Sequence, residues 1–483
     1  MKRLLLLLAL ATTASAQLPS ELDAFIEKAR VAYDVPGIAI TVVRDGHVVA
    51  TKGYGVRRIG SPERVDENTM FDIASLSKSF TAAAIATLVD NGTMRWDDPV
   101  RRWLPQLEFA DAYRTQNVTI RDLLSHRLGL EAGNFVFRFT NYSTEEVLRR
   151  MRFLKEREPF RTSFIYSNLG YTAAGEAAAV AAKMSWTDLV RTRLVEPLDM
   201  HDTTVGVTHD TGSNFASPHG VIAGVHQPIR NKKAMTILPA NGVNSNAKDM
   251  AKWLLFQLGD GIWEGKRIIS AESMMEMHSP QNIIATTPAM RANRGVKFFA
   301  AYGLGWQVMD FRGHPMLWHS GSADGMPVYM AILPDDHIGV AVLTNTWLAP
   351  FLHGTIANHI LDTLLGNKPD ELPPAPGITI PPDPPRVRGT SPSLALDAYA
   401  GTYVDPLYGD MLVKLANGKL ALYFAGDEAA DLEHWHYNTF RVRWRDRAYE
   451  DFDTLAAFSL DAQGTPKRME MKLNRDFVEA VRK

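Results

Sequence analysis

The spacing of apolar and polar residues divides the chain into two strand-rich ends with a helical stretch between them. Apolar residues recur at helical spacing before Pro36-Gly37 and again after Ser75, where the stripe consists of Leu76, Phe80, Ala84 and Leu88. Residues 38–43 and 47–50 are apolar runs on either side of a polar turn, which is typical of a hairpin. Strand-like patterns return at 302–308, 328–330 and 340–343, and a last helix is expected over 351–365.

This order of elements predicts an α/β (α+β) domain over residues 17–366. Its antiparallel sheet would be assembled from both ends of the domain, because strand patterns occur at both ends. Between them, Thr119 is expected to cap one apolar helix, and the alanine-rich run 173–182 predicts another. We therefore expect a helical subdomain to flank the sheet.

A smaller domain is predicted after a proline-rich linker. Residues 367–393 contain repeated proline pairs, which favour a semi-rigid extended segment. Beyond the linker, short segments of period two are separated by turn residues at Asn417-Gly418 and at 461–464. Residues 394–483 are therefore expected to form a small antiparallel barrel or sandwich.

The composition narrows the class of partner. Of the 483 residues 46% are hydrophobic and 22% charged, with a formal net charge of −2, which is typical of a soluble globular protein. There is no basic excess to favour nucleic acid. The absence of cysteine excludes disulfides, thiol catalysis and lipid-modified cysteine. The expected partner is a small molecule or short peptide, and the sequence predicts no oligomeric state.

Residues 1–16 have the pattern of a cleavable secretory signal. A basic pair at 2–3 precedes an apolar run over 4–11, and a stretch of small residues ends at Ala16. The apolar run is too short for a permanent membrane anchor. We therefore expect cleavage after Ala16, a periplasmic or secreted location and no stable membrane anchor.

Ser75 and Lys78 form the first candidate catalytic pair. Residues three apart share one face of a helix, and the N–H groups of its first turn lack intrahelical partners. A lysine that is partly desolvated can lose its proton and then accept the proton of a nearby hydroxyl. This Ser-x-x-Lys arrangement is used by serine acyl-transfer enzymes that need no histidine base. At its second occurrence, residues 245–248, we expect a capping serine and a solvated lysine instead.

Tyr166-Ser167-Asn168 is the only Tyr-x-Asn triplet in the chain. The reference pKa of a phenol is about 10 and that of lysine about 10.4, so a proton shared by the two titrates as a pair and either group could be the base. The Asn168 amide can accept from a lysine and donate to a substrate carbonyl. Alternatively, Tyr166 and Asn168 cap the helix that starts near Leu169.

His319-Ser320-Gly321 is the only triplet of the form Lys/His-Ser/Thr-Gly. A glycine at a strand end lets the backbone approach a substrate closely. The same residues also fit a simple turn between two strands.

Together, in this order, the three motifs resemble those of the serine β-lactamase-related family, which includes class C β-lactamases, penicillin-binding proteins and D-aminopeptidases of the peptidase S12 type. Supporting family-like stretches are 123–126 and 196–198, and the resemblance covers roughly residues 22–366. The tail, with Tyr399-Ala400-Gly401-Thr402-Tyr403, is similar to the lipocalin-like domain of some members.

The resemblance implies roles for individual residues. Ser75 would be the nucleophile that forms an acyl-enzyme, and Lys78 and Tyr166 would transfer its proton. The N–H groups of Ser75 and Ser322 would form the oxyanion hole, and no cofactor or metal is implied. The implied substrate-binding residues are Asn168, His319, Ser320, Gly321 and Ser322.

His319 departs from the pattern of the β-lactamases, which usually carry lysine there, and is more similar to the D-aminopeptidase branch. A neutral histidine offers no full charge to a substrate carboxylate, and such a charge at 4 Å is worth up to about 4 kcal/mol. We therefore expect weak hydrolysis of carboxylate-bearing β-lactams and better turnover of D-amino-acid peptides, amides or esters. His319 is alternatively expected to assist Tyr166 in proton transfer.

Other functions are kept as alternatives. A carboxylesterase is one, and a β-lactam- or muropeptide-binding protein that acylates without turnover is another. Ser75 lacks the flanking glycines of an α/β-hydrolase elbow. His434 and His436 could bind a metal, but a half-exposed strand is the favoured interpretation. The C-terminal domain is expected to shield the pocket, bind a lipophilic group or mediate oligomerisation.

Overall fold

The structure is a computed structural model that describes residues 18–134, 136–206, 214–230, 235–288, 299–349, 351–375, 383–424, 427–446, 454–473 and 476–483. The predicted signal at 1–16 and the proline pair at 381–382 lie outside these residues. Within the described ranges, none of the helices combines the length and the apolar character needed to cross a membrane.

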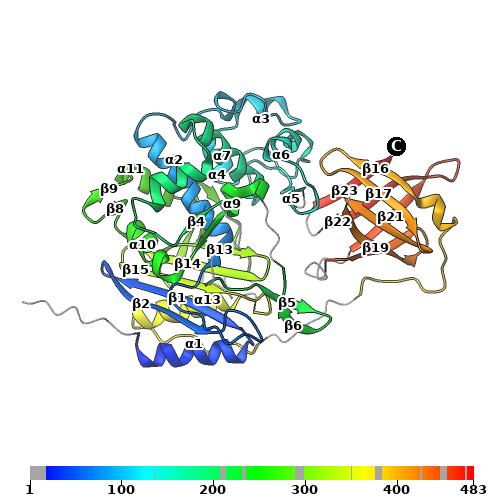
Figure 1. Ribbon diagram of the computed structural model, residues 1–483. Coiled ribbons are helices and arrows are strands. Elements are labelled where there is room, and N and C mark those ends of the chain that lie inside the picture. Colours follow the sequence, from blue (N-terminus) through cyan, green and yellow to red (C-terminus); the bar gives the residue numbers. More distant parts are fainter. Residues whose placement is uncertain are drawn as a thin grey trace, which may run out of the picture.

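An antiparallel sheet of eight strands, in the order β10-β11-β12-β13-β14-β15-β1-β2, forms the centre of the α/β domain (Figure 1). The predicted hairpin is β1 (Gly37–Arg44) and β2 (His47–Gly55), and β1 also pairs with β15 (Ile338–Thr344) from the far end of the domain. The prediction of a sheet built from both ends is therefore confirmed. The other strands are β10 (Asn282–Ile283), β11 (Ala300–Tyr302), β12 (Gln307–Phe311), β13 (His314–Ala323) and β14 (Met326–Leu333).

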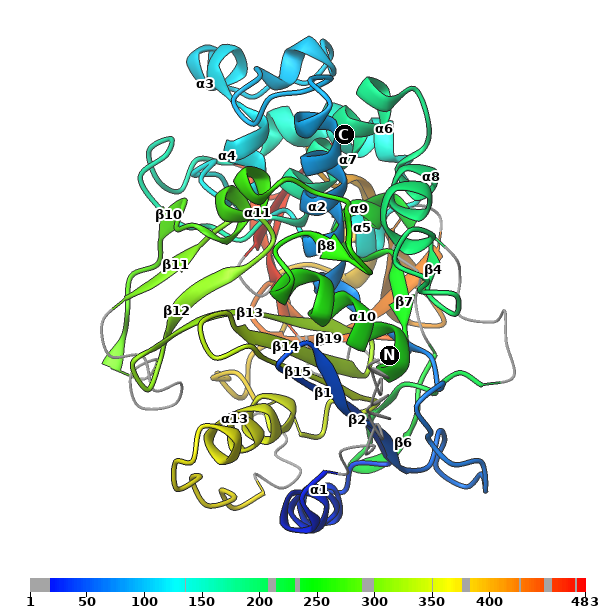
Figure 2. The same cartoon turned by 90° about the vertical axis from the view of Figure 1, so that its left-hand side faces the viewer.

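Helices cover both faces of this sheet (Figure 2). The first and last helices of the domain, α1 (Ser20–Ala32) and α13 (Leu352–Leu364), lie on one face, and α10 (Ala247–Leu258) with the helical subdomain lies on the other. Side chains of β1 alternate between the two cores, with Ile40 in the first and Ala39 in the second. The sheet is therefore buried on both sides.

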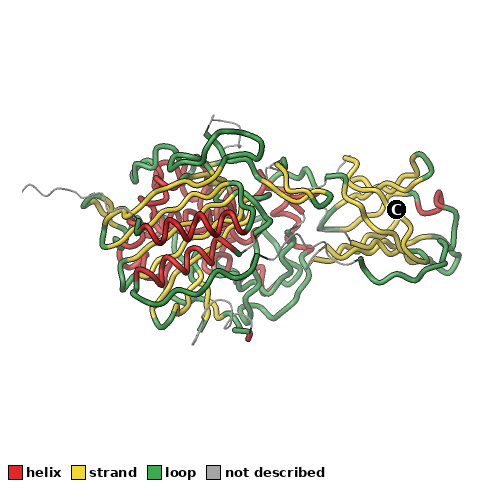
Figure 3. Tube along the Cα trace, turned by 90° about the horizontal axis from the view of Figure 1, so that it is seen from below, coloured by secondary structure: helices red, strands yellow, loops and turns green. Residues whose placement is uncertain are grey.

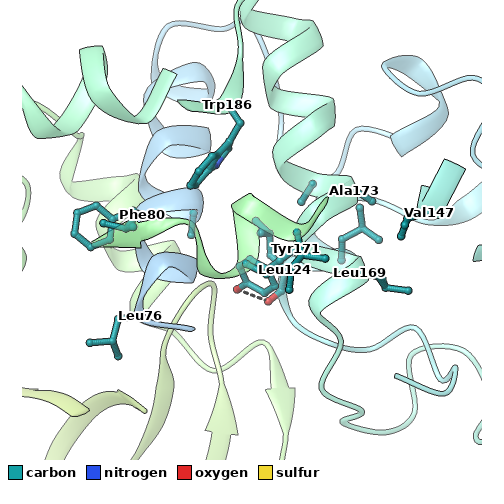
Figure 4. Packing of buried hydrophobic residues seen from close by; sticks show 14 of the residues in the cluster. Leu76, Phe80, Leu124, Val147, Leu169, Tyr171, Ala173 and Trp186 are labelled. Atoms are coloured by element: carbon teal, nitrogen blue, oxygen red, sulfur yellow. Dashed lines mark hydrogen bonds between the residues drawn. The ribbon is translucent and has the colours of Figure 1, made fainter. Parts of the chain in front are cut away.

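Helix α2 (Ser77–Asp90) runs through the centre of the helical subdomain, and its predicted stripe is buried. The alanines on its other face are buried as well, because α7 (Asn168–Ala182), α8 (Trp186–Val190) and α9 (Leu238–Asn241) pack around it. Figure 4 shows Phe80 on α2, Trp186 beside this helix, and the hydrogen bond from Tyr171 to the Leu124 carbonyl. The other α-helices among the described residues are α3 (Ala112–Asn117), α4 (Ile120–Leu124), α5 (Val136–Phe139), α6 (Thr144–Arg150) and α11 (Ala271–His278).

Three short β-ladders lie outside the central sheet in the described residues. The largest has the order β3-β7-β4. Its middle strand lies just before α10, and its first strand lies just before Ser75. The bounds of these and the other short strands are β3 (Phe71–Asp72), β4 (Thr204–Val205), β5 (His219–Ile222), β6 (Val225–Pro228), β7 (Val243–Ser245), β8 (Ile262–Trp263) and β9 (Lys266–Arg267).

The prediction of one continuous strand over 302–308 is wrong. A turn separates β11 from β12, with the Gly303 N–H donating to the Trp306 carbonyl at 2.8 Å. Gly305 has a φ of +86°, and a Cβ there would lie 2.8 Å from the Cα of Ser79. The break therefore exists because the turn packs against the start of α2.

At the second Ser-x-x-Lys motif the helix cap lies one residue later than predicted. Asn246 is the N-cap of α10 and accepts the Asp249 N–H at 2.8 Å, while Ser245 is buried in β7. Lys248 is exposed, as expected for a solvated lysine. The second motif therefore has a structural role.

The C-terminal residues form a closed eight-stranded antiparallel barrel, so of the two predicted architectures the barrel is confirmed. Inward-facing residues such as Leu420, Leu422 and Phe424 are buried as their period-two pattern indicates. The strands are β16 (Gly401–Asp405), β17 (Gly409–Ala416), β18 (Lys419–Phe424), β19 (Asp427–His436), β20 (Thr439–Trp444), β21 (Thr454–Leu460), β22 (Pro466–Leu473) and β23 (Asp476–Arg482).

The barrel lies beside the helical subdomain, at the end where α5 is found (Figures 1 and 3). The Phe139 ring of α5 stacks on Trp444 of β20, with ring centroids 4.4 Å apart. The described ends of the linker are tied to the folded parts, since Tyr33 donates to the Pro373 carbonyl and Trp435 to the Pro385 carbonyl. Barrel and α/β domain therefore share an ordered interface.

Candidate active site

Ser75 lies in a single 3-10 turn, Ala74–Leu76, directly before α2, so the regular helix begins two residues later than predicted. The preceding residue, Ala74, has a φ of +46°, which is unusual for a residue other than glycine. Its N–H donates to Asp72 Oδ1 at 2.7 Å, and this bond holds the turn. Such strained backbone is concentrated at functional sites, and here it presents the Ser75 hydroxyl.

Lys78 is fully buried beside that hydroxyl. Its Nζ donates to Ser75 Oγ at 3.1 Å, to Asn168 Oδ1 at 2.8 Å and to the Ala240 carbonyl at 3.0 Å. These partners satisfy the three donors of an ammonium group but supply no negative charge. Burial therefore lowers the pKa of Lys78 well below its ordinary value of 10.5, and this favours the neutral amine.

The Tyr166 hydroxyl donates to the same Ser75 Oγ at 2.8 Å. Burial raises the pKa of Tyr166 far above its ordinary value of 10, although the bond to Ser75 acts in the opposite direction. The phenol therefore keeps its proton. Of the two groups that the sequence left open as base, the geometry and the pKa directions favour Lys78 as proton acceptor and Tyr166 as proton donor.

Asn168 is the first residue of α7, and its side chain connects Lys78 to the loop before α5. Its Oδ1 accepts from Lys78, and its Nδ2 donates to Asn134 Oδ1 at 3.0 Å. The cap of α7 is Ser167, which accepts the Gly170 N–H, so the interpretation of Tyr166 and Asn168 as capping residues is wrong, and both face the site. The contact with Asn134 has no signal in the sequence.

His126 is a buried site residue that sequence reasoning used only as support for the resemblance. Its Nδ1 accepts the Ser167 N–H at 3.1 Å, so the proton of the neutral ring is assigned to Nε2. Its ring lies 4.5 Å from that of Tyr166 and 4.6 Å from that of Tyr302, measured between centroids. Burial, together with the charge of Lys78, lowers the pKa of His126 well below its ordinary value. His126 is therefore neutral, and it holds the turn that carries Tyr166 through the hydrogen bond from the Ser167 N–H.

The His319-Ser320-Gly321 triplet lies inside β13, and the turn follows it at residues 324–325, so its interpretation as a turn is wrong. His319 Nδ1 lies 2.7 Å from the Ser320 carbonyl, which can only accept, so this nitrogen carries the proton and Nε2 accepts from the Tyr302 hydroxyl at 2.9 Å. Burial, with the charge of Lys78, lowers the pKa of His319 to about 3. His319 is therefore neutral.

Both ring nitrogens of His319 are thus engaged away from Tyr166, and the two rings lie 6.3 Å apart between centroids. The geometry therefore gives no support to direct assistance of Tyr166 by His319.

Gly321 brings the edge of β13 against the nucleophile. A Cβ at this position would lie 2.6 Å from the Ile73 carbonyl and 3.0 Å from the Ser75 nitrogen. Only glycine permits this approach, which places the Ser75 N–H beside the backbone that leads to Ser322. Ser322 is exposed, and its Oγ accepts from the Trp347 indole at 3.0 Å. These residues border the place where a substrate carbonyl would meet Ser75.

His434 and His436 are half-buried in β19, with a register shift between them. His434 Nε2 lies 3.1 Å from the Tyr437 carbonyl. In the described ranges, no group of three or more histidine or acidic side chains is arranged to hold a metal ion. The half-exposed strand is thus the interpretation that the geometry supports.

Comparison with known proteins covers both parts of the chain. The Beta-lactamase family model matches residues 22–364, and a model for a domain of unknown function (DUF3471) matches residues 385–482. The unguisins hydrolase ungD' of Aspergillus campestris (strain IBT 28561) is 28% identical over 358 residues, which are 70% of this chain and 64% of that protein. Penicillin-binding protein 4 of Amycolatopsis lactamdurans is 28% identical over 384 residues, 77% of this chain and 94% of that protein.

Solved structures share the whole architecture. The octameric penicillin-binding protein homologue from Pyrococcus abyssi aligns with a TM-score of 0.63 at 24% identity, covering 95% of this chain and 99% of that one. SurE aligns with a TM-score of 0.59 at 19% identity, covering 96% and 99%. The family model spans all three sequence motifs. The chain therefore belongs to the beta-lactamase family, among the hydrolases related to penicillin-binding proteins.

Proposed function

We propose that the protein is a serine hydrolase, of the peptidase S12 type, that cleaves amide bonds in D-amino-acid peptides or β-lactam-like molecules through an acyl-enzyme on Ser75. One observation carries the proposal: Ser75 Oγ lies 3.1 Å from Lys78 Nζ and 2.8 Å from Tyr166 Oη. A buried amine and a phenol on one hydroxyl supply both a base and an acid.

Acylation begins when Ser75 Oγ attacks the substrate carbonyl and its proton passes to the neutral amine of Lys78. The oxyanion that forms would accept from the N–H groups of Ser75 and Ser322. Tyr166 gives its proton to the leaving nitrogen as the C–N bond breaks. The Lys78 ammonium, 4.8 Å from the Tyr166 ring centroid, then returns a proton to the phenolate, which restores both groups.

In deacylation a water molecule replaces the amine product. Lys78 again removes a proton, now from the water that attacks the ester carbonyl, and Tyr166 again donates one, now to the leaving Ser75 Oγ. The tetrahedral intermediate collapses to the free acid, and Ser75 Oγ recovers its proton. The same residues thus serve both halves of the reaction.

The substrate class follows from the charge state of the site. His319 is neutral, and Arg138 near the β13 turn is paired with Asp324 at 3.1 Å. A substrate carboxylate would gain little at the position where related β-lactamases carry lysine. The proposed substrates are therefore peptides or amides without a carboxylate at that position, and the name of the unguisins hydrolase supports hydrolysis rather than storage of the acyl group.

Ester hydrolysis is a second candidate function of the same site, favoured by the neutral His319. A protein that is acylated without turnover is the candidate from another class, and the penicillin-binding relative keeps it open. Lys78 and Tyr166 on one hydroxyl favour turnover, because both steps then have a base and an acid.

The test incubates the protein with a labelled penicillin, a p-nitrophenyl ester and a D-alanine p-nitroanilide, with Ser75→Ala as the control. The proposal expects turnover of the anilide, slow penicillin hydrolysis, an acyl adduct on Ser75, and a loss of about 10⁴- to 10⁶-fold in the variant. Stable labelling by the penicillin without turnover would support the binding protein. Turnover of the p-nitrophenyl ester alone would support the esterase. Unchanged turnover in Ser75→Ala would overturn the mechanism.

We also propose export of the chain, with a leader at 1–16 and a linker at 367–393 between the two domains. The signal-like pattern described above supports the leader. Recovery of mature protein beginning at Gln17 from the periplasm or medium is the expected result, and retention of Met1 in exported protein would contradict it.

A further inference from the structure

Asp476, the first residue of β23 in the barrel, reaches out of the barrel to the α/β domain. It is buried, with 2% of its surface exposed. Its two carboxylate oxygens accept the N–H groups of Gly133 and Asn134, at 3.3 and 2.9 Å respectively. Gly133 has a φ of +60°, and successive N–H groups in such a turn form a concave binding place for an anion. The Asp476 carboxylate of the barrel thus occupies an anion-binding site formed by backbone N–H groups in the loop before α5.

The barrel also holds the other end of this segment. Phe139, the last residue of α5, stacks on Trp444 at 4.4 Å between centroids and lies 5.6 Å from Phe424. Residues 133–134 and 136–139 are therefore contacted by barrel side chains at both ends. We call these residues the bridging segment.

The bridging segment faces the active site with its polar side chains. Asn134 Oδ1 accepts from Asn168 Nδ2, and this contact fixes which end of the Asn168 amide points to Lys78. With Nδ2 engaged by Asn134, the carbonyl end is the one that accepts from Lys78 Nζ. Arg138 pairs with Asp324, in the turn that follows Ser322. The segment therefore touches both sides of the site.

We propose that Asp476 is a positioning residue of the active site, through which the barrel holds the bridging segment so that Asn134 orients Asn168 toward Lys78. The inference rests on the proposed function, because it assigns the barrel a part in preparing the catalytic base. The C-terminal barrel thereby acts on the chemistry of the active site without lining it. Its contact with Asn134 is the hydrogen bond from the Asn134 N–H to Asp476, at 2.9 Å.

Other contacts across the interface provide a matched control. Glu479, three residues further along β23, forms an exposed ion pair with Lys155 at 2.8 Å. This pair joins the same two parts of the molecule but does not contact the bridging segment. Glu479→Gln therefore removes one carboxylate from the same strand and interface while leaving the proposed route intact.

The test compares Asp476→Asn with Glu479→Gln in the full chain. In Asp476→Asn an amide N–H₂ replaces one of the two accepting oxygens, so one loop N–H loses its partner. We expect kcat/KM for the p-nitrophenyl ester to fall about tenfold, as for the loss of one charge-assisted hydrogen bond. The acid limb of its pH profile should move to lower pH, because the ammonium of Lys78 loses an oriented acceptor. Glu479→Gln should change neither quantity.

Two further measurements make the route specific. Hydrogen exchange of a peptide covering 133–139 should be faster in Asp476→Asn and unchanged in Glu479→Gln. Asn134→Ala should reproduce the loss and the pH shift with the barrel contact intact. The double variant Asp476→Asn/Asn134→Ala should be about as active as the less active of the two single variants, because both changes break the same chain of contacts.

The outcomes separate this inference from the proposed function. If Ser75→Ala is inactive but Asp476→Asn matches Glu479→Gln in rate, pH limb and exchange, the positioning role is wrong and the hydrolase stands. Additive losses in the double variant would also overturn the role. If Ser75→Ala keeps full turnover, the proposed function fails, and faster exchange in Asp476→Asn would then support only the anchoring contact.

Discussion

Lys78 has three hydrogen-bond acceptors and no carboxylate among them, and this sets the pH at which Ser75 can react. A protonated amine cannot take the serine proton, so kcat/KM should fall as the pH decreases through the lowered pKa of Lys78. We expect an acid limb with a midpoint well below 10.5, measured with an uncharged ester. Lys78→Met should lose about 10³-fold or more. An acid limb that persists unchanged in residual Lys78→Met activity would contradict the assignment.

Tyr166→Phe separates the acid from the base. Removing the hydroxyl should lower kcat for the anilide by about 10²- to 10⁴-fold, because the leaving amine loses its proton donor. The acid limb of the pH profile should stay in place, since the raised pKa of Tyr166 keeps its titration far above this range. Steady-state rates across pH check both parts. A shift of the acid limb in Tyr166→Phe would instead make the phenol part of the titrating base.

Gly321 tests how closely the strand edge must approach Ser75. In Gly321→Ala the new Cβ would lie 2.6 Å from the Ile73 carbonyl, so the strand or the turn must move. We expect kcat/KM to fall at least about tenfold, and stability to fall by about 1–3 kcal/mol, as for overpacking. In the matched control, Gly354→Ala in α13, the nearest atom to the new Cβ is at 3.8 Å, so activity should stay and Tm should rise slightly. Equal activity in both variants would contradict the close approach.

The residues that the sequence identified and those that it missed differ in what fixes their position. Ser75 and Lys78 are three apart on one turn, so local geometry alone brings them together. Tyr166 and Asn168 were placed by the resemblance, and the structure brings them to the same hydroxyl and amine. His126 was not predicted as a site residue, because its partner is a backbone N–H forty-one residues away, and no pattern of side chains records that contact.

The start of α4 is joined to the segment that carries Tyr166 through the carboxylate of Asp122. Asp122 in α4 is fully buried, completes a capping box with Thr119, and accepts from Arg161 at 2.9 and 2.7 Å. It also accepts from Arg127. Arg161 lies five residues before Tyr166, with a φ of +67°. One carboxylate therefore joins the start of α4 to the approach of the catalytic phenol.

Asp122→Asn should destabilise the protein in a pH-dependent way. Burial alone would raise the pKa of Asp122, but the Arg161 bond and the Arg127 charge outweigh it, and the pKa is lowered. A lowered pKa means stability that is present at neutral pH and lost as the pH falls through the folded-state value. We expect a loss of about 3 kcal/mol, or roughly 5 °C in Tm, at pH 7. Calorimetry should show the difference between the wild type and the variant shrinking as the pH falls below the ordinary pKa of a carboxyl group; a pH-independent difference would contradict the charge argument.

Element boundaries were predictable where capping chemistry is local. Thr119 caps α4 as its sequence indicates, and α1, α7 and α13 follow their apolar patterns. The strand over 302–308 was mispredicted because its glycines respond to α2 and α11, which lie far away in the sequence. The 3-10 turn at Ser75 was likewise invisible, since it depends on strain at Ala74 that the fold imposes.

At the scale of the whole molecule, the sheet and the barrel were predictable but their interface was not. Pairing of β1 with β15 follows from strand patterns at both ends of one domain. The interface instead depends on single residues such as Phe139, Asp476 and Glu131, which come from separate segments with no shared pattern. A second barrel residue, Tyr408, brings its buried hydroxyl to the same place, without a hydrogen-bond partner among the described residues. The contact between the barrel and the α/β domain therefore leaves polar groups such as the Tyr408 hydroxyl buried without a hydrogen bond from the described residues.

Glu131, on the α/β side of the interface, is 5% exposed. Its Oε1 accepts the Lys155 N–H at 3.0 Å, while Oε2 is 3.6 Å from Arg157 and receives no hydrogen bond from the part of the chain that the structure describes. Burial raises the pKa of Glu131, and the nearby Asp476 charge adds to the effect against the opposing charges of Lys155 and Arg157. The folded protein therefore holds this proton more tightly than the unfolded chain does.

A raised carboxyl pKa makes no difference to stability below the unfolded value and reduces stability as the pH rises toward the folded value. Glu131→Gln removes the titration but keeps the acceptor for Lys155, so the variant should match the wild type near pH 4 and exceed it at pH 8. The gain should appear as a higher Tm of the variant at pH 8 and no difference near pH 4. Thermal unfolding across this pH range checks the prediction. A variant less stable than the wild type at pH 8 would mean that the ion pair with Arg157, and not the buried charge, dominates this edge of the interface.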